Sequence, residues 1–161
     1  MCKVNLMYGV GDFLHTHINI NPFSEQEPDS QLIRGQIFNL DYKFDDGEIE
    51  EIVAKDVIDY IPIIEVDAVL KNWSNKLCVG GKLILSGTDL IEVCKAFSQY
   101  KLDINQTNTL LHGTQQKPYL IKRINFTAVG MSDYLSGVLG LKVIRKIVNN
   151  YTMTVEAIRI K

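Results

Sequence analysis

The sequence predicts an α/β fold with a mostly parallel sheet, and three observations support this. Short apolar runs typical of strands alternate with segments whose apolar residues recur every three or four positions, as on one face of a helix. Strands that alternate with helices favour a parallel sheet with helices on both faces. Near the C-terminus, two strand-like runs flank Asn149-Asn150, a pair suited to a hairpin turn, which adds an antiparallel strand.

The expected strands are short, and most of them end at turn-forming residues such as Gly9, Pro22 and Gly47. In chain order they are residues 4–8, 17–20, 33–40, 49–54, 82–86, 141–148 and 152–160.

Helices are expected between these strands. Pro62 suits the first turn of a helix whose apolar face reaches Leu77. Asp89 is a candidate N-cap for the next helix, and Gly140 fits the C-cap position of a helix over 127–139. Residues 103–125 are polar and irregular, with room for one short helix before His112-Gly113.

Composition and charge exclude several classes of protein. The chain has 161 residues, of which 46% are hydrophobic and 22% charged, and its net charge is −2 (17 Lys and Arg against 19 Asp and Glu). This balance is not that of a disordered chain, and it lacks the basic excess of a general nucleic-acid binder. The length predicts one domain over residues 1–161.

The three cysteines and the N-terminus favour a cytoplasmic protein. Cys2, Cys78 and Cys94 are odd in number and form no CxxC pair, as expected for reduced thiols. No secretory signal or membrane-spanning apolar run is visible, so we expect no membrane association. His15 and His17 share a strand face but lack a third ligand, so no metal site is expected.

A ligand of an open α/β sheet binds at the carboxyl ends of the strands, which directs attention to the loops there. After the first strand, Gly9 and Gly11 would let the backbone approach a ligand closely and present N–H groups to an anion. Leu14 stands where a dinucleotide-binding GxGxxG motif would have its third glycine, and no GK[ST] of a Walker A loop follows.

Several segments together resemble a known family. They are residues 3–9, 18–21, 39–41, 44–47, 51–62, 69–73, 77–86, 126–127 and 139–143. The chain resembles class I S-adenosylmethionine-dependent methyltransferases, of the small type found in phages and beside polysaccharide genes. The resemblance runs nearly from end to end and is strongest over 49–89. It implies a Rossmann-like fold with a seven-stranded sheet whose last strand is antiparallel.

The resemblance also implies S-adenosylmethionine as cofactor, with Asp41 accepting a hydrogen bond from the adenine amino group. The implied cofactor-binding residues are Met7, Tyr8, Gly9, Gly11, Asp12, Asn21, Asp41 and Asp56. The glycine-rich loop is degenerate, since Asn5 and Met7 replace an acidic residue and a glycine. Asn21 stands where the family has the acidic residue that binds the ribose, and an amide oxygen is a weaker acceptor than a carboxylate.

Methyl transfer is an in-line displacement that needs positioning and, for some acceptors, a base. The candidate bases are Asp56, Asp59, Tyr60 and His112. Each also has an ordinary structural explanation, such as helix capping or a solvated loop. We expect the acceptor to be a small molecule, a sugar or glycan, or a protein side chain. We also expect its site to be completed by residues 103–125 or by a second subunit in a homodimer.

Three functions therefore stand at this point. The first is a small S-adenosylmethionine-dependent methyltransferase. The second is a methyltransferase-like binding or assembly protein without catalysis, which is favoured by Met7, by Asn21 and by the absence of the family's histidines within Asp56–Tyr60. The third is a Rossmann-like nucleotide-binding domain with another ligand. The missing third glycine is evidence against a dinucleotide such as NAD.

Overall fold

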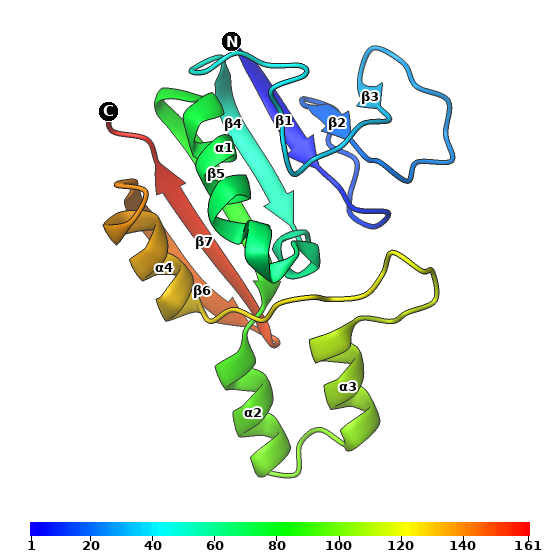
Figure 1. The fold of residues 1–161 in the computed structure, drawn as a ribbon. Helices are drawn as coiled ribbons and strands as arrows, with labels where there is room; N and C mark the ends of the chain where they lie inside the picture. Colours follow the sequence, from blue (N-terminus) through cyan, green and yellow to red (C-terminus); the bar gives the residue numbers. More distant parts are fainter.

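A seven-stranded sheet with strand order β3-β2-β1-β4-β5-β7-β6 organises the chain (Figure 1). The computed structural model describes all residues from Met1 to Lys161. The strands are β1 (Cys2–Leu6), β2 (Ile18–Ile20), β3 (Leu32–Ile33), β4 (Ile49–Lys55), β5 (Leu77–Thr88), β6 (Lys142–Asn149) and β7 (Thr152–Ile158). The helices are the 3₁₀ turns η1 (Ile58–Tyr60) and η2 (Ile63–Glu65), and α1 (Val66–Lys76), α2 (Leu90–Ser98), α3 (Ile104–His112) and α4 (Ala128–Gly137).

The predicted fold class is confirmed. Strands β1 to β5 pair in parallel, and β7 runs antiparallel between β5 and β6. Strand β1 lies between β2 and β4, so the order of the strands reverses at this point of the sheet. Ligands of open α/β sheets bind beside such a reversal, at the carboxyl ends of the strands.

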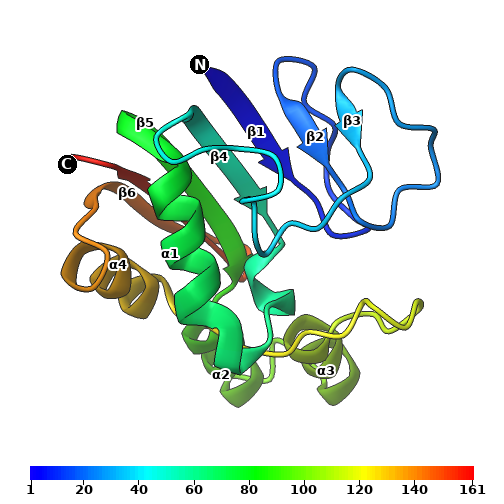
Figure 2. The same ribbon diagram turned by 45° about the horizontal axis from the view of Figure 1, so that its top comes forward.

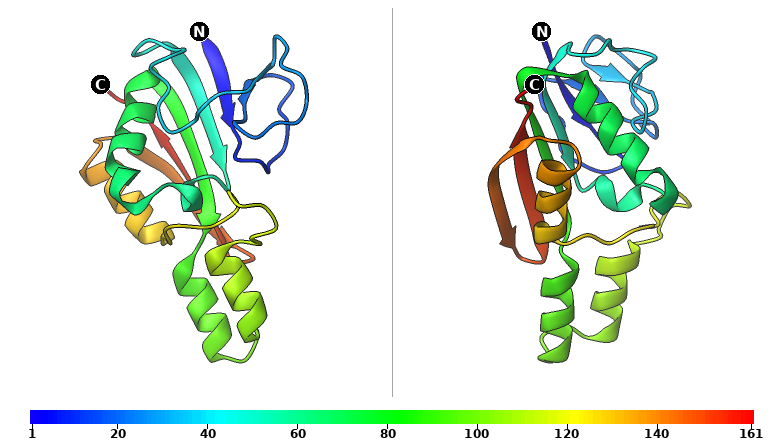
Figure 3. Two further views of the ribbon diagram at one scale, coloured as in Figure 1. Left: turned by 45° about the vertical axis from the view of Figure 1, so that its right-hand side comes forward. Right: turned by 60° about the vertical axis from the view of Figure 1, so that its left-hand side comes forward.

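The expectation of helices on both faces of the sheet is wrong. Helices α1 and α4 lie against the same face, while α2 and α3 project beyond the carboxyl ends of the strands (Figures 2 and 3). The core lies between this face and the two helices, and Leu6, Ile52, Leu83, Leu135 and Val155 are fully or almost fully buried in it. The cause is local, because the connections 7–17, 21–31 and 34–48 contain no helix.

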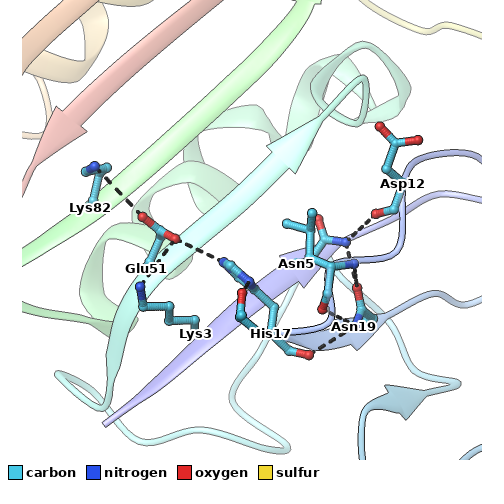
Figure 4. A network of polar contacts seen from close by, with 9 residues as sticks. Lys3, Asn5, Asp12, His17, Asn19, Glu51 and Lys82 are labelled. Atoms are coloured by element: carbon cyan, nitrogen blue, oxygen red, sulfur yellow. Dashed lines mark hydrogen bonds and ion pairs between the residues drawn. The ribbon is translucent and has the colours of Figure 1, made fainter.

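The opposite face of the sheet is polar where β1 and β4 meet (Figure 4). Glu51 accepts from His17 Nε2 at 3.0 Å and forms longer ion pairs with Lys3 and Lys82, at 4.0 and 3.9 Å. Beside them, Asn5 Nδ2 donates to Asn19 Oδ1 and to the Asp12 carbonyl. Paired charges and amides satisfy the polar groups here, where loop residues such as Asp12 and Leu14, rather than a helix, bond the buried Asn5 and Asn19.

The connection from β3 to β4 is a loop that two consecutive residues of α1 hold in place. The Trp73 indole N–H donates to the Ile37 carbonyl at 2.7 Å, and Asn72 Oδ1 accepts from Leu40 N at 2.9 Å. The strand expected over 33–40 is therefore wrong beyond Ile33, because residues from Ile37 onward pack against a helix rather than a strand.

No helix in the structure combines the length and apolar character needed to span a membrane.

The C-terminal hairpin turns one residue later than predicted. Asn149 pairs with Thr152, so the turn residues are Asn150 and Tyr151, with φ of 49° and 66°. Two successive residues at positive φ are typical of a type I′ turn, which suits the twist of paired strands.

The predicted N-cap Asp89 is confirmed, and it serves two helices. Its Oδ1 accepts from Glu92 N at 3.0 Å in the first turn of α2, and its Oδ2 accepts from Ala128 N at 2.8 Å at the start of α4. This buried carboxylate thus joins the N-termini of two helices.

We predict that Asp89→Ala lowers the free energy of unfolding by about 2–4 kcal/mol, because it leaves two N–H groups without acceptors. Urea unfolding followed by circular dichroism measures this. The exposed N-cap of α3 provides the control, since Asp103→Ala should cost only about 1 kcal/mol. Equal losses for the two variants would contradict the double role of Asp89.

Candidate functional site

A cavity of about 600 Å³ opens at the carboxyl ends of β1 and β2. Three segments and one residue of β3 line it. They contribute Met7, Gly9, Val10, Gly11 and Phe13; Asn21, Phe23, Ser24, Glu25 and Gln26; Gln116, Lys117, Tyr119 and Leu120; and Leu32. Its volume lies within the range of small-molecule sites, about 300–1,000 Å³. Of the predicted cofactor-binding residues, Met7, Gly9, Gly11 and Asn21 meet here.

The loop after β1 needs its two glycines. Gly9 has φ of 72° and Gly11 has φ of 120°, both in the region that favours glycine. A Cβ on Gly9 would run into the ring of Tyr119, so the close approach of these two segments also requires glycine.

Asn21 acts as an acceptor for the backbone of both loops. Its Oδ1 accepts from Gly9 N at 2.9 Å and from Phe23 N at 3.1 Å, and its side chain is buried. These two bonds fix the loop after β1 against the loop after β2. The amide oxygen at this position is therefore already used within the protein.

Five aromatic rings fill the space beside the cavity, where the strand order reverses. Tyr8 stacks between Phe38 and Tyr60, with ring centroids 5.5 and 5.0 Å apart. Phe23 meets Tyr8 edge-on at 4.9 Å and stacks on Tyr119 at 3.7 Å, with 4° between the ring planes. Burial raises the pKa of Tyr8 and Tyr60, so neither phenol is a ready base. Tyr8 and Tyr60 are thus part of the packing.

Asp59 is buried and holds several segments together. Its Oδ2 accepts from Thr88 N at 3.0 Å and pairs with Lys122 Nζ at 3.1 Å, and its carbonyl accepts from Arg123 N at 2.7 Å. Burial raises the pKa of its carboxyl, although the Lys122 ammonium and the Thr88 N–H oppose this shift. Its Oδ1 has no partner and faces Gly87.

The remaining predicted residues lie away from the cavity. Asp41 pairs with Lys76 at 2.7 Å at the amino end of β5, where hydrogen bonds from Lys76 and Asn72 lower the pKa of its carboxyl. The structure thus takes Asp41 to the opposite end of the sheet and does not support the expected adenine contact. Asp12 lies in the loop after β1 with its carbonyl bonded to Asn5, outside the cavity lining.

Asp56 and His112 are exposed but do not line the cavity. Asp56 follows β4 at φ of 54°, and its N–H donates to the Ser86 carbonyl at 3.0 Å. His112 is the last residue of α3.

Sequence reasoning missed the residues that give the cavity its chemistry. Glu25 provides its only carboxylate and Lys117 its only ammonium, while Phe23 and Tyr119 provide aromatic rings. Glu25 and Phe23 lie in a loop with two prolines, and Lys117 and Tyr119 flank Pro118. A polar loop with an embedded aromatic residue was the available signal, but nothing local shows which cavity such a loop faces.

Solved structures with this fold are similar over nearly the whole chain. A protein of Pyrococcus horikoshii, PH0226, matches with a TM-score of 0.64 and 18% identity, over 98% of this chain and 82% of the other. An S-adenosylmethionine-dependent methyltransferase of Mesorhizobium loti matches with a TM-score of 0.63 and 13% identity, over 98% and 91%.

A third similar structure contains a bound ligand. The magnesium protoporphyrin IX methyltransferase of Synechocystis, with bound S-adenosylhomocysteine, matches with a TM-score of 0.58 and 13% identity, over 98% and 74%. Scans against protein-family models and curated proteins find no match. The chain therefore has the fold of class I methyltransferases, and these comparisons concern the fold alone.

For the site itself, we predict that Asn21→Leu lowers the free energy of unfolding by about 2–4 kcal/mol, since two loop N–H groups lose their acceptor. Asn21→Asp keeps an acceptor oxygen and should stay within about 1 kcal/mol of the wild type. Chemical denaturation of both variants measures the difference. A loss as large for Asp as for Leu would show that the acceptor oxygen is not what matters.

Proposed function

We propose that this chain binds S-adenosylmethionine in the cavity at the carboxyl ends of β1 and β2 and transfers its methyl group to an acceptor. The cavity itself carries this proposal, because it joins the glycine-containing loop after β1 to the loop after β2 in a methyltransferase fold. When bound, S-adenosylmethionine supplies an electrophilic methyl group on a sulfonium. The acceptor class stays open among small molecules, sugars or glycans, and protein side chains.

The chemistry of the cavity lining fits the cofactor. The planar adenine base can stack on the rings of Phe13 and Phe23. Lys117 provides a cation for the carboxylate of the cofactor's methionine part. Glu25 provides a carboxylate for the ribose hydroxyls, which Asn21 cannot replace because its oxygen already accepts two backbone bonds. Met7 narrows the cavity beside Gly11 without filling it.

Among the four predicted bases, Asp56 is the one we retain for acceptors that must lose a proton. It is exposed and directly follows β4, at the same edge of the sheet as the cavity. The buried Asp59 and the stacked Tyr60 have structural partners, and His112 ends α3. Residues 103–125 border the cavity through Gln116 to Leu120, so this segment is our proposed wall of the acceptor site.

A second candidate function is a binding or assembly protein without methyl transfer. The stack of Tyr8 between Phe38 and Tyr60 favours it, because these rings fill the space beside the reversal of strand order. Rings that pack against one another in this space leave less of it for a cofactor.

Calorimetric titration with S-adenosylhomocysteine and S-adenosylmethionine separates the two functions. The proposed function predicts dissociation constants in the micromolar range, about −8 kcal/mol. Absence of both binding heat and a thermal shift at high protein concentration would favour the binding or assembly protein.

Glu25→Gln tests the ribose contact. Charge-assisted hydrogen bonds are about twice as strong as neutral ones, so we expect roughly five- to tenfold weaker binding of S-adenosylhomocysteine. Glu27→Gln is the matched control, because Glu27 lies in the same loop but does not line the cavity. The affinity of this variant for S-adenosylhomocysteine should equal that of the wild type. Equal effects of the two substitutions would contradict the assignment of Glu25.

A further inference from the structure

We propose that Tyr119 competes with the planar base of the ligand for the face of Phe23, so that the tip of residues 113–125 gates the cavity. We call residues 113–125 the strap. This inference rests on the proposed function, since it concerns how the same cavity admits its ligand. The strap joins α3 to α4 and lies beyond the carboxyl ends of the strands (Figure 1).

The first step is the geometry of the two rings. Phe23 and Tyr119 are almost parallel and their centroids are 3.7 Å apart, which leaves no space for a third ring between them. The Tyr119 ring also lies directly over Gly9 and meets Tyr8 edge-on at 6.2 Å. It therefore covers both the stacking surface of Phe23 and the glycine at which a ligand would approach the backbone.

The second step is that the tip of the strap is held by local bonds. Leu120 N donates to the Lys117 carbonyl at 3.0 Å, a turn with Pro118 at its second position. Gln115 N donates to the Leu120 carbonyl at 3.1 Å, within the strap itself. Residues 116–118 are exposed, so the stack with Phe23 is a main attachment of the tip to the loops across the cavity.

The third step is that both ends of the strap are anchored. Lys122 N donates to the His112 carbonyl, and the Lys122 ammonium contacts Asp59 Oδ2, Thr88 Oγ1 and the Leu110 carbonyl at 2.7–3.1 Å. Leu120 is buried in the core. On the other side, Gly113 N donates to the Thr109 carbonyl in α3 at 3.0 Å, and Gly113 and Gln115 adopt φ of 84° and 56°. Anchored ends with a locally bonded tip allow Tyr119 to swing away while the fold stays intact.

Competition for Phe23 has a measurable consequence. When only a fraction of the molecules exposes a binding surface, the apparent affinity falls by that fraction. A stacked pair of aromatic rings is worth a factor of roughly 2 to 12 in an equilibrium constant. Removing the Tyr119 ring should therefore strengthen binding, whereas removing the Phe23 ring should weaken it.

The experiment is calorimetric titration of S-adenosylhomocysteine into the wild type and four variants, with stopped-flow association rates. Tyr119→Ala should bind roughly 2- to 12-fold tighter and associate faster, while Phe23→Ala should bind more weakly. Tyr119→Phe keeps the stack and should match the wild type. Tyr100→Ala, at an exposed tyrosine between α2 and α3, is the distant control and should also match.

The outcomes separate this inference from the proposed function. If the wild type binds and Tyr119→Ala binds equally or more weakly, Tyr119 is an ordinary lining residue and the gate is overturned, while the proposed function stands. If neither the wild type nor Tyr119→Ala binds, the proposed function falls and the gate falls with it. Thermal melts of every variant establish that each one is folded before it is titrated.

Discussion

The Asp59–Lys122 pair is the interaction on which the carboxyl edge of the sheet depends. Asp59 lies in η1 after β4, and its carboxylate holds the end of β5 through Thr88 N. Lys122 brings the strap and, through the Leu110 carbonyl, α3 to the same point. Breaking a buried pair leaves an uncompensated charge, which is strongly unfavourable. One ion pair thus joins η1, the end of β5, α3 and the strap, and the strap lines one side of the cavity.

The sheet reaches this arrangement with few helices. The three connections before β4 are loops. Side-chain hydrogen bonds hold these loops in place, where other α/β sheets have crossover helices. Asn5, Asn19 and Asn21 bond the loops after β1 and β2, while Trp73 and Asn72 of α1 hold the loop before β4. Because these loops replace helices, their residues meet the strap directly and form the cavity wall.

The sequence was sufficient for the fold class and only partly for the arrangement of the helices and for the site. Periodicity and turn residues located most of the strands and helices and the N-cap Asp89, since these depend on local chemistry, but the strand expected over 33–40 ends at Ile33. The sequence could not predict which face of the sheet the helices cover, because no local pattern distinguishes a long loop from a connection that contains a crossover helix. Asp41 was misplaced for a related reason. Its position depends on Lys76, which is distant in the chain. That residues 1–161 form one domain stays a prediction.

The candidate site combines both kinds of residue. Met7, Gly9, Gly11 and Asn21 were predicted from the family resemblance. They meet because each follows a strand, and strand ends meet at one edge of a parallel sheet. Glu25, Lys117 and Tyr119 lie in loops whose course is set by long-range contacts such as the Phe23–Tyr119 stack. Side chains on such loops have no sequence signature that states what they face.

The central claim is that the ligand site lies between the loops after β1 and β2 and the strap. Amide chemical-shift changes on titration with S-adenosylhomocysteine, measured by two-dimensional NMR, test it most directly. The account predicts that the largest changes fall in residues 7–13, 21–26 and 116–120, with little change around Asp41. Changes centred on Asp41 and α1, or no saturable changes at all, would contradict it.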